Sequence, residues 1–194
     1  MLFAAVAIGG ICGIGLPRGS AQVASRFEAG ANYSFVRSNG PADRCGCFSM
    51  NGGNGWLGYR FYRGWSAVGE FGAVRAPSIG SAGADLTLIT YLGGARYDWR
   101  HHWLHSAHLT PFGQVLLGGV HASGSLAPGT LLLAGTPNSF AMTAGGGADI
   151  RLTPRWSIRA IQADYLLTRL NNGNNNRQNN LRISFGVLYR FDRE

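Results

Sequence analysis

The chain has 194 residues and a formal net charge of +8, and its basic residues other than histidine are all arginine. The arginines are scattered, without a cluster or an RNA-binding motif, so the sequence argues against a nucleic-acid-binding protein. With 30 glycines and only 13% charged residues, the composition suits short strands that have one apolar and one polar face. Beyond the N-terminal region, no apolar run reaches the roughly 20 residues that a transmembrane helix needs.

The N-terminal segment predicts a secretory signal. Residues 2–16 are apolar and rich in glycine, and Pro-Arg-Gly-Ser-Ala follows at residues 17–21, with cleavage expected after Ala21. The predicted organisation is a signal peptide at residues 1–21 and one domain at residues 22–194. No basic residue precedes the apolar run, which departs from the usual signal pattern. Cys12 lacks the small preceding residue of a lipoprotein cysteine, so no lipid anchor is expected.

An alternation of apolar and polar residues with a period of two recurs along the rest of the chain and predicts strands. The eight predicted strands are residues 27–35, 56–61, 67–73, 86–97, 111–121, 140–150, 156–167 and 180–191. Long connections at residues 37–47, 77–85, 122–138 and 171–180 alternate with shorter ones at residues 62–65, 98–108 and 152–155. Strands of roughly ten residues, with short turns at one end and long loops at the other, are typical of transmembrane barrels. The predicted fold is therefore an all-β, eight-stranded, antiparallel, up-and-down transmembrane β-barrel.

The last predicted strand alternates without a break and ends in the pattern Ser184-x-Gly186-x-x-Tyr189-x-Phe191. This ending resembles the C-terminal signal by which the assembly machinery recognises bacterial outer-membrane barrels. The residues after Phe191 depart from that signal, since many such barrels stop at the aromatic residue. Alternation alone also fits the terminal strand of a soluble sheet, so a soluble, secreted ligand-binding barrel is kept as an alternative.

Over residues 27–191 the chain resembles the small outer-membrane β-barrel family, which includes OmpX and the membrane domain of OmpA. Besides the C-terminal signal, the resemblance rests on Gly-x-Arg-Tyr at residues 94–97 and Ala-Asp-Tyr at residues 163–165. It implies insertion in the bacterial outer membrane with both chain termini in the periplasm. The implied partners are outer-membrane lipid, lipopolysaccharide and the barrel-assembly machinery, with no cofactor and with the extracellular partner left unidentified. These motifs are specific for the fold and say little about function.

Aromatic residues gather near the predicted short turns, and such rings prefer the headgroup level of a membrane. They predict a periplasmic girdle made of Trp65, Trp99, Trp103, Trp156, Tyr62, Tyr97, Tyr189 and Phe191. A thinner outer girdle is predicted at Phe35, Phe48 and Phe140. In a soluble protein the same aromatic residues would pack a core.

Charged residues on the predicted inward faces form the candidate site. The predicted lumen network consists of Glu28, Arg60, Glu70, Arg96, Asp149, Asp164, Arg182 and Arg190. In an eight-stranded barrel these acids and arginines can pair with one another and fill the interior as a structural plug. The alternative is a gated ion path in which the salt bridges switch partners. The register of residues 156–167 is ambiguous, and it places Arg159 either at the rim or beside a bulge.

Three smaller groups of residues offer other chemistry. His121 and Ser123 share a face, as in barrels that deacylate lipid A, but no acid is placed to orient the histidine. Cys45 and Cys47 fall in a predicted loop of an oxidising compartment, where a disulfide would close a small, strained ring. Four histidines crowd one predicted connection and are expected in a solvated turn rather than a metal site: His101, His102, His105 and His108.

The function predicted from these patterns is a non-enzymatic outer-membrane barrel whose loops serve surface interaction, adhesion or envelope integrity. The first alternative is a low-conductance channel through the salt-bridged lumen. A lipid A-modifying enzyme built on His121 and Ser123 is the third hypothesis. No catalytic, cofactor-binding or metal site is assigned.

Overall fold

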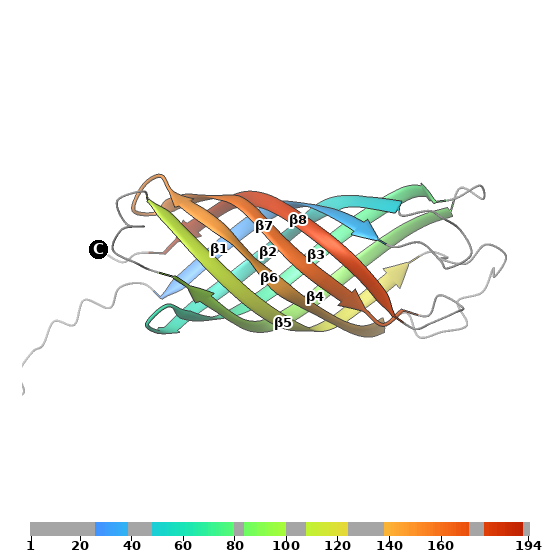
Figure 1. The fold of residues 1–194 in the computed structure, drawn as a ribbon, viewed down its shortest axis with the longest axis horizontal. Helices are drawn as coiled ribbons and strands as arrows, with labels where there is room; N and C mark the ends of the chain where they lie inside the picture. The colour runs from blue at the N-terminus through green and yellow to red at the C-terminus, as the bar shows by residue number, and fades with distance from the viewer. Residues whose placement is uncertain are drawn as a thin grey trace, which may run out of the picture.

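The computed structural model describes residues 26–38, 48–79, 84–99, 108–123, 138–170 and 177–191. Its strands are β1 (Phe27–Ser38), β2 (Phe48–Tyr62), β3 (Trp65–Ile79), β4 (Ala84–Asp98), β5 (Leu109–Ser123), β6 (Asn138–Arg151), β7 (Trp156–Thr168) and β8 (Gln178–Arg190). Neighbouring strands in the sequence pair antiparallel, and β1 pairs with β8 to close the barrel (Figure 1). The prediction of an all-β, eight-stranded antiparallel barrel is confirmed. In the described part of the chain, no helix is long and apolar enough to cross a membrane.

Several sequence predictions concern residues outside the described ranges and stay predictions. These are the signal peptide at residues 1–21, the disulfide between Cys45 and Cys47, the ring of Trp103, and the first three members of the histidine cluster. His108, the fourth histidine, lies in the turn before β5 and has a positive φ of 53°.

The two ends of the barrel differ in their connections. At one end β1 begins and β8 ends, with Glu28 paired to Arg190, and residues 63–64 and 152–155 make short turns there. We call this the turn end. At the opposite end, called the loop end, β1 stops at Ser38 and β8 starts at Gln178. Figure 1 shows the strands running between these ends at a tilt to the long axis, as closure of a sheet into a barrel requires.

The turn between β2 and β3 depends on its glycine and fixes one residue of the candidate site. Gly64 has φ +100°, and a Cβ there would lie 2.7 Å from the carbonyl oxygen of Asp98. The Asp98 amide donates to the Gly64 carbonyl oxygen at 2.9 Å. This hydrogen bond ties the end of β4 to the β2–β3 turn and so holds Asp98 at the turn end of the lumen.

Most strands extend further toward the loop end than the sequence predicted. β2 begins at Phe48 instead of residue 56, because the glycine-rich residues 50–55 pair through their backbone without showing apolar alternation. The predicted loop at residues 77–85 is wrong at both of its ends, since β3 continues to Ile79 and β4 begins at Ala84. Asp98, predicted in a connection, ends β4.

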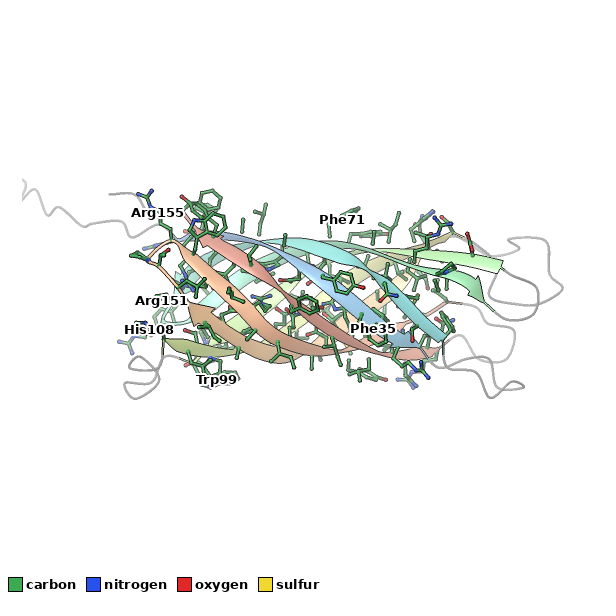
Figure 2. The ribbon with its side chains drawn as sticks, turned by 90° about the horizontal axis from the view of Figure 1, so that it is seen from above. Phe35, Phe71, Trp99, His108, Arg151 and Arg155 are labelled. Carbon is green, nitrogen blue, oxygen red and sulfur yellow. The ribbon has the colours of Figure 1, made fainter. Side chains whose placement is uncertain are left out.

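Side chains alternate between the outer surface and the interior along the strands, with an interruption in β7 where the register shifts. The outward set is apolar and exposed over most of the barrel; Phe71, for example, keeps 61% of its surface exposed. In Figure 2, Phe71 projects away from the outer surface of the sheet. The inward set is buried and contains both charged and aliphatic side chains. The exterior is thus the apolar face, which is the reverse of a soluble barrel.

Candidate functional site

An ion-paired arginine, Arg182, crosses the middle of the lumen. Its Nη1 lies 2.5 Å from Glu70 Oε1 on β3, and its Nη2 lies 2.7 Å from Asp164 Oδ2 on β7. Its Nε also donates to the same Asp164 oxygen at 3.0 Å. In the barrel order, β1 and β2 separate β8 from β3, so the pair of Arg182 with Glu70 bridges across the interior. We call these three residues the central cluster.

A second group of charges lies nearer the turn end, around Asp149. Asp149 accepts hydrogen bonds from Arg159 Nε at 2.9 Å and from Arg96 Nη2 at 2.5 Å. Arg96 Nε donates in turn to Asp98 Oδ1 at 2.7 Å. All four side chains are almost fully buried. Because water cannot solvate them, each charge depends on its partners, and removing one partner would be costly.

Two aromatic rings lie against the paired arginines. The guanidinium carbon of Arg159 is 4.6 Å from the ring centre of Trp56 and 4.3 Å from that of Phe112. The corresponding distances for Arg96 are 5.3 and 3.9 Å. A cation over an aromatic face is favoured most where water is excluded. The Trp56 ring fits because its neighbour is a glycine: a Cβ on Gly30 would lie 2.5 Å from Trp56 Nε1.

The network of polar contacts extends from the group around Asp149 in both directions along the lumen. Toward the middle, Gln162 accepts from Arg159 Nη1 at 2.7 Å and donates to Asp164 Oδ2 at 2.6 Å. Toward the turn end, Glu28 pairs with Arg60, and its Oε2 lies 3.9 Å from Arg190 Nε. Arg60 Nη2 also lies 3.6 Å from Asp98 Oδ2. The turn-end cluster is defined as Glu28, Arg60, Arg96, Asp98, Asp149, Arg159 and Arg190.

Each residue of the predicted lumen network occupies an inward position and ion-pairs within these two clusters. Sequence reasoning missed two members, Asp98 and Arg159. Arg159 is 1% exposed, and the register shifts beside it on both sides of β7, so the bulge interpretation is right and the rim interpretation is wrong. The signal in the sequence is the odd spacing between Arg159 and Gln162, which both face inward only across a bulge.

The loop-end part of the lumen is largely apolar, unlike the predicted polar interior, although Ser38, Thr168, Gln178 and Asn180 are also buried there. Its apolar section consists of buried side chains that pack together: Val36, Met50, Val74, Leu86, Leu88, Val120, Ala141, Leu166 and Leu170. Phe48 packs against this apolar section, so its assignment to the outer aromatic girdle is wrong. The reason is its register, since Phe48 is paired with the inward-facing Ser38.

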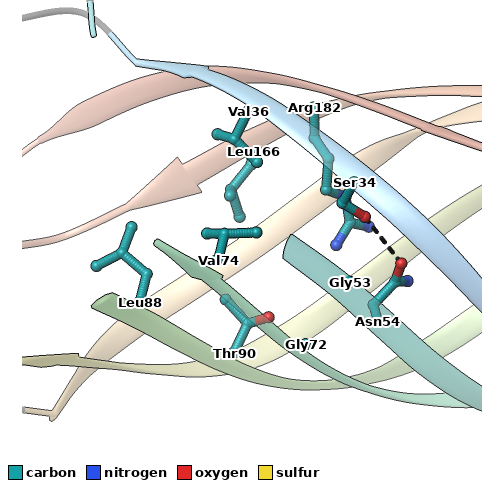
Figure 3. A pocket seen from close by; sticks show the side chains of 10 residues that line it. All are labelled: Ser34, Val36, Gly53, Asn54, Gly72, Val74, Leu88, Thr90, Leu166 and Arg182. Carbon is teal, nitrogen blue, oxygen red and sulfur yellow. Dashed lines mark hydrogen bonds between the residues drawn. The ribbon is translucent and has the colours of Figure 1, made fainter. Parts of the chain in front are cut away.

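A small cavity lies where the central cluster meets the apolar section (Figure 3). Arg182, Ser34, Asn54 and Thr90 line it, together with aliphatic residues of the apolar section. Ser34 Oγ donates to Asn54 Oδ1 at 2.9 Å across its wall. The cavity measures about 10 Å³, which is room for roughly one water molecule. It does not provide a path for a hydrated ion.

Aromatic side chains collect on the outer surface at the turn end. Trp65 packs on Tyr97 and Trp156 packs on Tyr189, each with ring centroids 5.0 Å apart. Trp99 lies edge-on to Tyr97 with centroids 5.3 Å apart. Figure 2 shows Trp99 projecting outward at this end of the barrel. These rings form a rim at one level around the turn end.

The predicted assembly signal lies on β8 and immediately after it. The inward-facing Ser184 shares a hydrogen bond of 2.9 Å with Ser34. Gly186 also faces inward, where a Cβ would lie 2.5 Å from Asn32 Oδ1. Tyr189 and Phe191 join the aromatic rim, with ring centroids 5.1 Å apart. Recognition of these residues by the assembly machinery stays a prediction.

A sequence profile described as the outer membrane protein beta-barrel domain matches residues 3–191. The chain belongs to the outer membrane protein β-barrel family. The resemblance predicted from the C-terminal signal is thereby confirmed, and membership places the protein in the bacterial outer membrane. No curated protein sequence matches the chain.

Solved structures of other outer membrane β-barrels share the fold. Neisserial surface protein A is 18% identical with a TM-score of 0.64, covering 87% of this chain and 99% of its own. Ail, the attachment invasion locus protein of Yersinia pestis, is 16% identical with a TM-score of 0.52, covering 84% and 98%. OprG from Pseudomonas aeruginosa is 13% identical with a TM-score of 0.54, covering 87% and 96%. Identities this low show likeness of fold alone.

In an outer membrane β-barrel, the exposed apolar band faces lipid and aromatic rings mark its borders. The outward residues of this chain form such a band, ending at the turn end in the aromatic rim. This explains why large apolar side chains such as Leu57, Phe71 and Phe185 are exposed. The soluble, secreted barrel kept as an alternative does not fit this surface or the family.

His121, one half of the predicted lipid-modifying pair, lies on the outward face of β5 near the loop end. Its Nδ1 lies 2.9 Å from Asn138 Oδ1. Asp149 lies at the other end of β6 and inside the lumen. An amide carries no charge to stabilise an imidazolium, which is the task of the acid in a triad. Within the described ranges, no three His, Cys, Asp or Glu side chains gather as a metal site.

Proposed function

We propose that this outer membrane β-barrel is non-enzymatic and that its working surface is the loop end, which contacts molecules outside the cell. In the proposed orientation, the turn end and both chain termini lie in the periplasm. The observation that supports the proposal is a polar collar on the outer surface, at the loop end of the apolar band. The collar is defined by Arg37, Ser49, Asn51, Arg75, Asp85, Asn138, Arg169, Arg177 and Asn179.

The collar exists because the strands are longer than a bilayer requires. β2, β3, β4 and β5 each have 15 residues, whereas a tilted strand crosses a membrane in about 9–11. Hydrogen bonds between strands hold its polar side chains in place. Arg37 Nη1 donates to Ser49 Oγ at 2.9 Å, and Arg75 Nη2 lies 2.5 Å from Asp85 Oδ2. The collar therefore forms a regular base for the four connections at this end.

Two tyrosines mark the border between the apolar band and the collar. Tyr33 donates its hydroxyl proton to Asn51 Oδ1 at 3.0 Å, and Tyr165 donates to Asn179 Oδ1 at 2.6 Å. Each ring therefore lies on the apolar side and each hydroxyl on the polar side. Tyrosine suits such a border because its ring is apolar and its hydroxyl can be hydrated.

The exposed charge of the collar favours an anionic partner. Its arginines are Arg37, Arg75, Arg169 and Arg177, and Asp85 is its acid. Guanidinium groups bind phosphate in a bidentate way, which supports lipopolysaccharide as the partner within the membrane. An attachment role for the loops draws support from the similarly folded Yersinia pestis protein, which is described as an attachment invasion locus protein. The barrel-assembly machinery is the partner proposed for Ser184, Gly186, Tyr189 and Phe191.

In planar lipid bilayers, we expect the refolded barrel to conduct no discrete current. The central and turn-end clusters are ion-paired, and the apolar section blocks the rest of the lumen even if salt bridges exchange. A gel shift on heating, which reports a closed barrel, is the control for correct folding. Current steps that change with Glu70→Gln would contradict the proposal and support the channel alternative.

Replacing the four loop-end connections by short Gly-Ser linkers is expected to abolish attachment to host cells and any envelope protection, while the barrel still folds. The affected segments are residues 39–47, 80–83, 124–137 and 171–176. Binding of bacteria to cells and survival in detergent measure the two effects. Replacing residues 152–155 at the turn end is the matched control and should change neither. If the loop variant kept both phenotypes at the level of the unmodified protein, the proposed working surface would be wrong.

A further inference from the structure

The turn-end mouth of the lumen carries an arc of polar side chains on five adjacent strands. In barrel order β2, β1, β8, β7 and β6, these are Arg60, Glu28, Arg190, Ser157 and Arg151. Glu28 pairs with Arg60 on one side and with Arg190 on the other. Arg190 Nη1 donates to Ser157 Oγ at 2.8 Å, and Ser157 is directly opposite Arg151 in the β6–β7 register. Directly opposite residues share a face of the sheet, so Arg151 belongs to the same arc.

Charge is distributed unevenly along the lumen. The central cluster has one arginine and two carboxylates. Around the mouth, five arginines face three carboxylates once Arg151 is counted with the turn-end cluster. Among the described residues of the lumen, the surplus of positive charge is therefore confined to the turn end, where the described acids do not balance it.

Several donors of the mouth are unused within the described part of the chain. Arg60 Nε and Arg190 Nε are buried and have no hydrogen-bond partner there. Arg151 is half-buried and forms no ion pair with the described residues. The Arg60 and Arg190 side chains remain 22% and 12% exposed, whereas the arginines deeper in the lumen are at most 4% exposed. Among the described arginines of the lumen, these three are therefore the ones that a solute at the turn end can reach.

We propose that the turn-end mouth binds a phosphate group, held by Arg60, Arg151 and Arg190. Three guanidinium groups, with a surplus of about two charges over Glu28, match the several acceptor oxygens of a phosphate group better than a single carboxylate. Ser157 supplies a hydroxyl between Arg190 and Arg151, and Glu28 holds Arg60 and Arg190 on either side of itself. The phosphate group can be free in solution or belong to a lipid headgroup, because the aromatic rim places the mouth near headgroup level.

The test for a free anion uses the refolded full chain in zwitterionic detergent micelles, titrated with inorganic phosphate and followed by amide NMR shifts of residues 151, 157 and 190. Sodium chloride at matched ionic strength is the comparison. We expect saturable shifts with phosphate alone, and Arg151→Gln should weaken binding at least about tenfold, the usual worth of a hydrogen bond to a charged group. Arg151 is chosen because it lies outside the ion pairs and its replacement should leave the barrel folded. Arg75→Gln, at the loop end, is the matched control and should bind as the unmodified chain does.

The test for a lipid source repeats the measurement without inorganic phosphate, in nanodiscs of zwitterionic phosphatidylcholine with and without anionic phosphatidylglycerol. Shifts at the same three amides that need phosphatidylglycerol and are lost in Arg151→Gln would assign the site to a lipid headgroup. Saturable shifts with inorganic phosphate would assign it to a soluble anion. The proposal is overturned if neither probe gives saturable shifts, if chloride gives the same shifts, or if Arg151→Gln binds as tightly as Arg75→Gln.

Discussion

Replacing Arg182 by methionine is expected to lower the free energy of unfolding of the barrel by about 3–5 kcal/mol. The variant keeps a long side chain but leaves Glu70 and Asp164 without their cation. Their side chains are 2% and 0% exposed, so water cannot replace the lost partner. Reversible urea unfolding in lipid vesicles, followed by tryptophan fluorescence, measures the change.

Two further variants separate charge from packing at this position. Arg75→Met breaks an exposed ion pair of the collar, whose members are 64% and 49% exposed, and should cost less than about 1 kcal/mol. Combining Arg182→Met with Glu70→Gln and Asp164→Asn should recover most of the lost stability, since no unpaired charge stays buried. If Arg182→Met were no less stable than Arg75→Met, the central cluster would not be what stabilises the middle of the lumen.

Trp56→Ala is expected to destabilise the barrel by about 3–5 kcal/mol, the usual cost of truncating a buried tryptophan. The ring is 5% exposed and lies between Gly30 and the guanidinium groups of Arg96 and Arg159. Its removal leaves a void beside two buried cations and takes away their aromatic contact. The same unfolding measurement reports the loss.

Trp156→Ala is the matched control for Trp56→Ala. Trp156 is 50% exposed on the outer surface, where lipid or detergent can fill the space that its ring leaves. Its loss should cost clearly less than that of Trp56. Equal losses for the two variants would mean that neither the burial of the Trp56 ring nor its contacts with Arg96 and Arg159 stabilise the barrel more than an outer-surface ring does.

The sequence predicts the number and order of the strands well because the outward residues of the middle and turn-end portions alternate strongly with polar inward ones. Toward the loop end the pattern is reversed, with apolar residues facing inward and polar residues facing outward. Inward Val36 is followed by outward Arg37, and inward Val74 is followed by outward Arg75. A reversed alternation resembles the end of a strand, so the predicted strands stop several residues before the real ones.

The candidate site was predictable where charges occupy regular inward positions, as Glu70 and Arg182 do. The inward position of Arg159 was not predicted because a bulge changes which residues of β7 face inward. The role of Asp98 was not predicted because Asp98 is the last residue of its strand. A tertiary hydrogen bond to Gly64 holds it there. Trp56 was expected only as the start of a strand, since nothing local shows that glycines at positions 30 and 58 make room for its ring. These features depend on register between strands, which a single sequence does not display.

The separation of the lumen into a charged part and an apolar part affects how the protein enters its membrane. In the proposed orientation, each hairpin inserts with its loop end leading, and that end travels through the whole hydrocarbon layer. Many of the inward residues of this leading portion are aliphatic, such as Val36, Leu88 and Leu166. Carrying a charge to the bilayer centre is costly, and most of the arginines and carboxylates of the lumen remain on the side from which the chain arrives. The collar charges still cross, but the charge distribution of the lumen adds little to that cost in this direction and would add more for an inverted barrel.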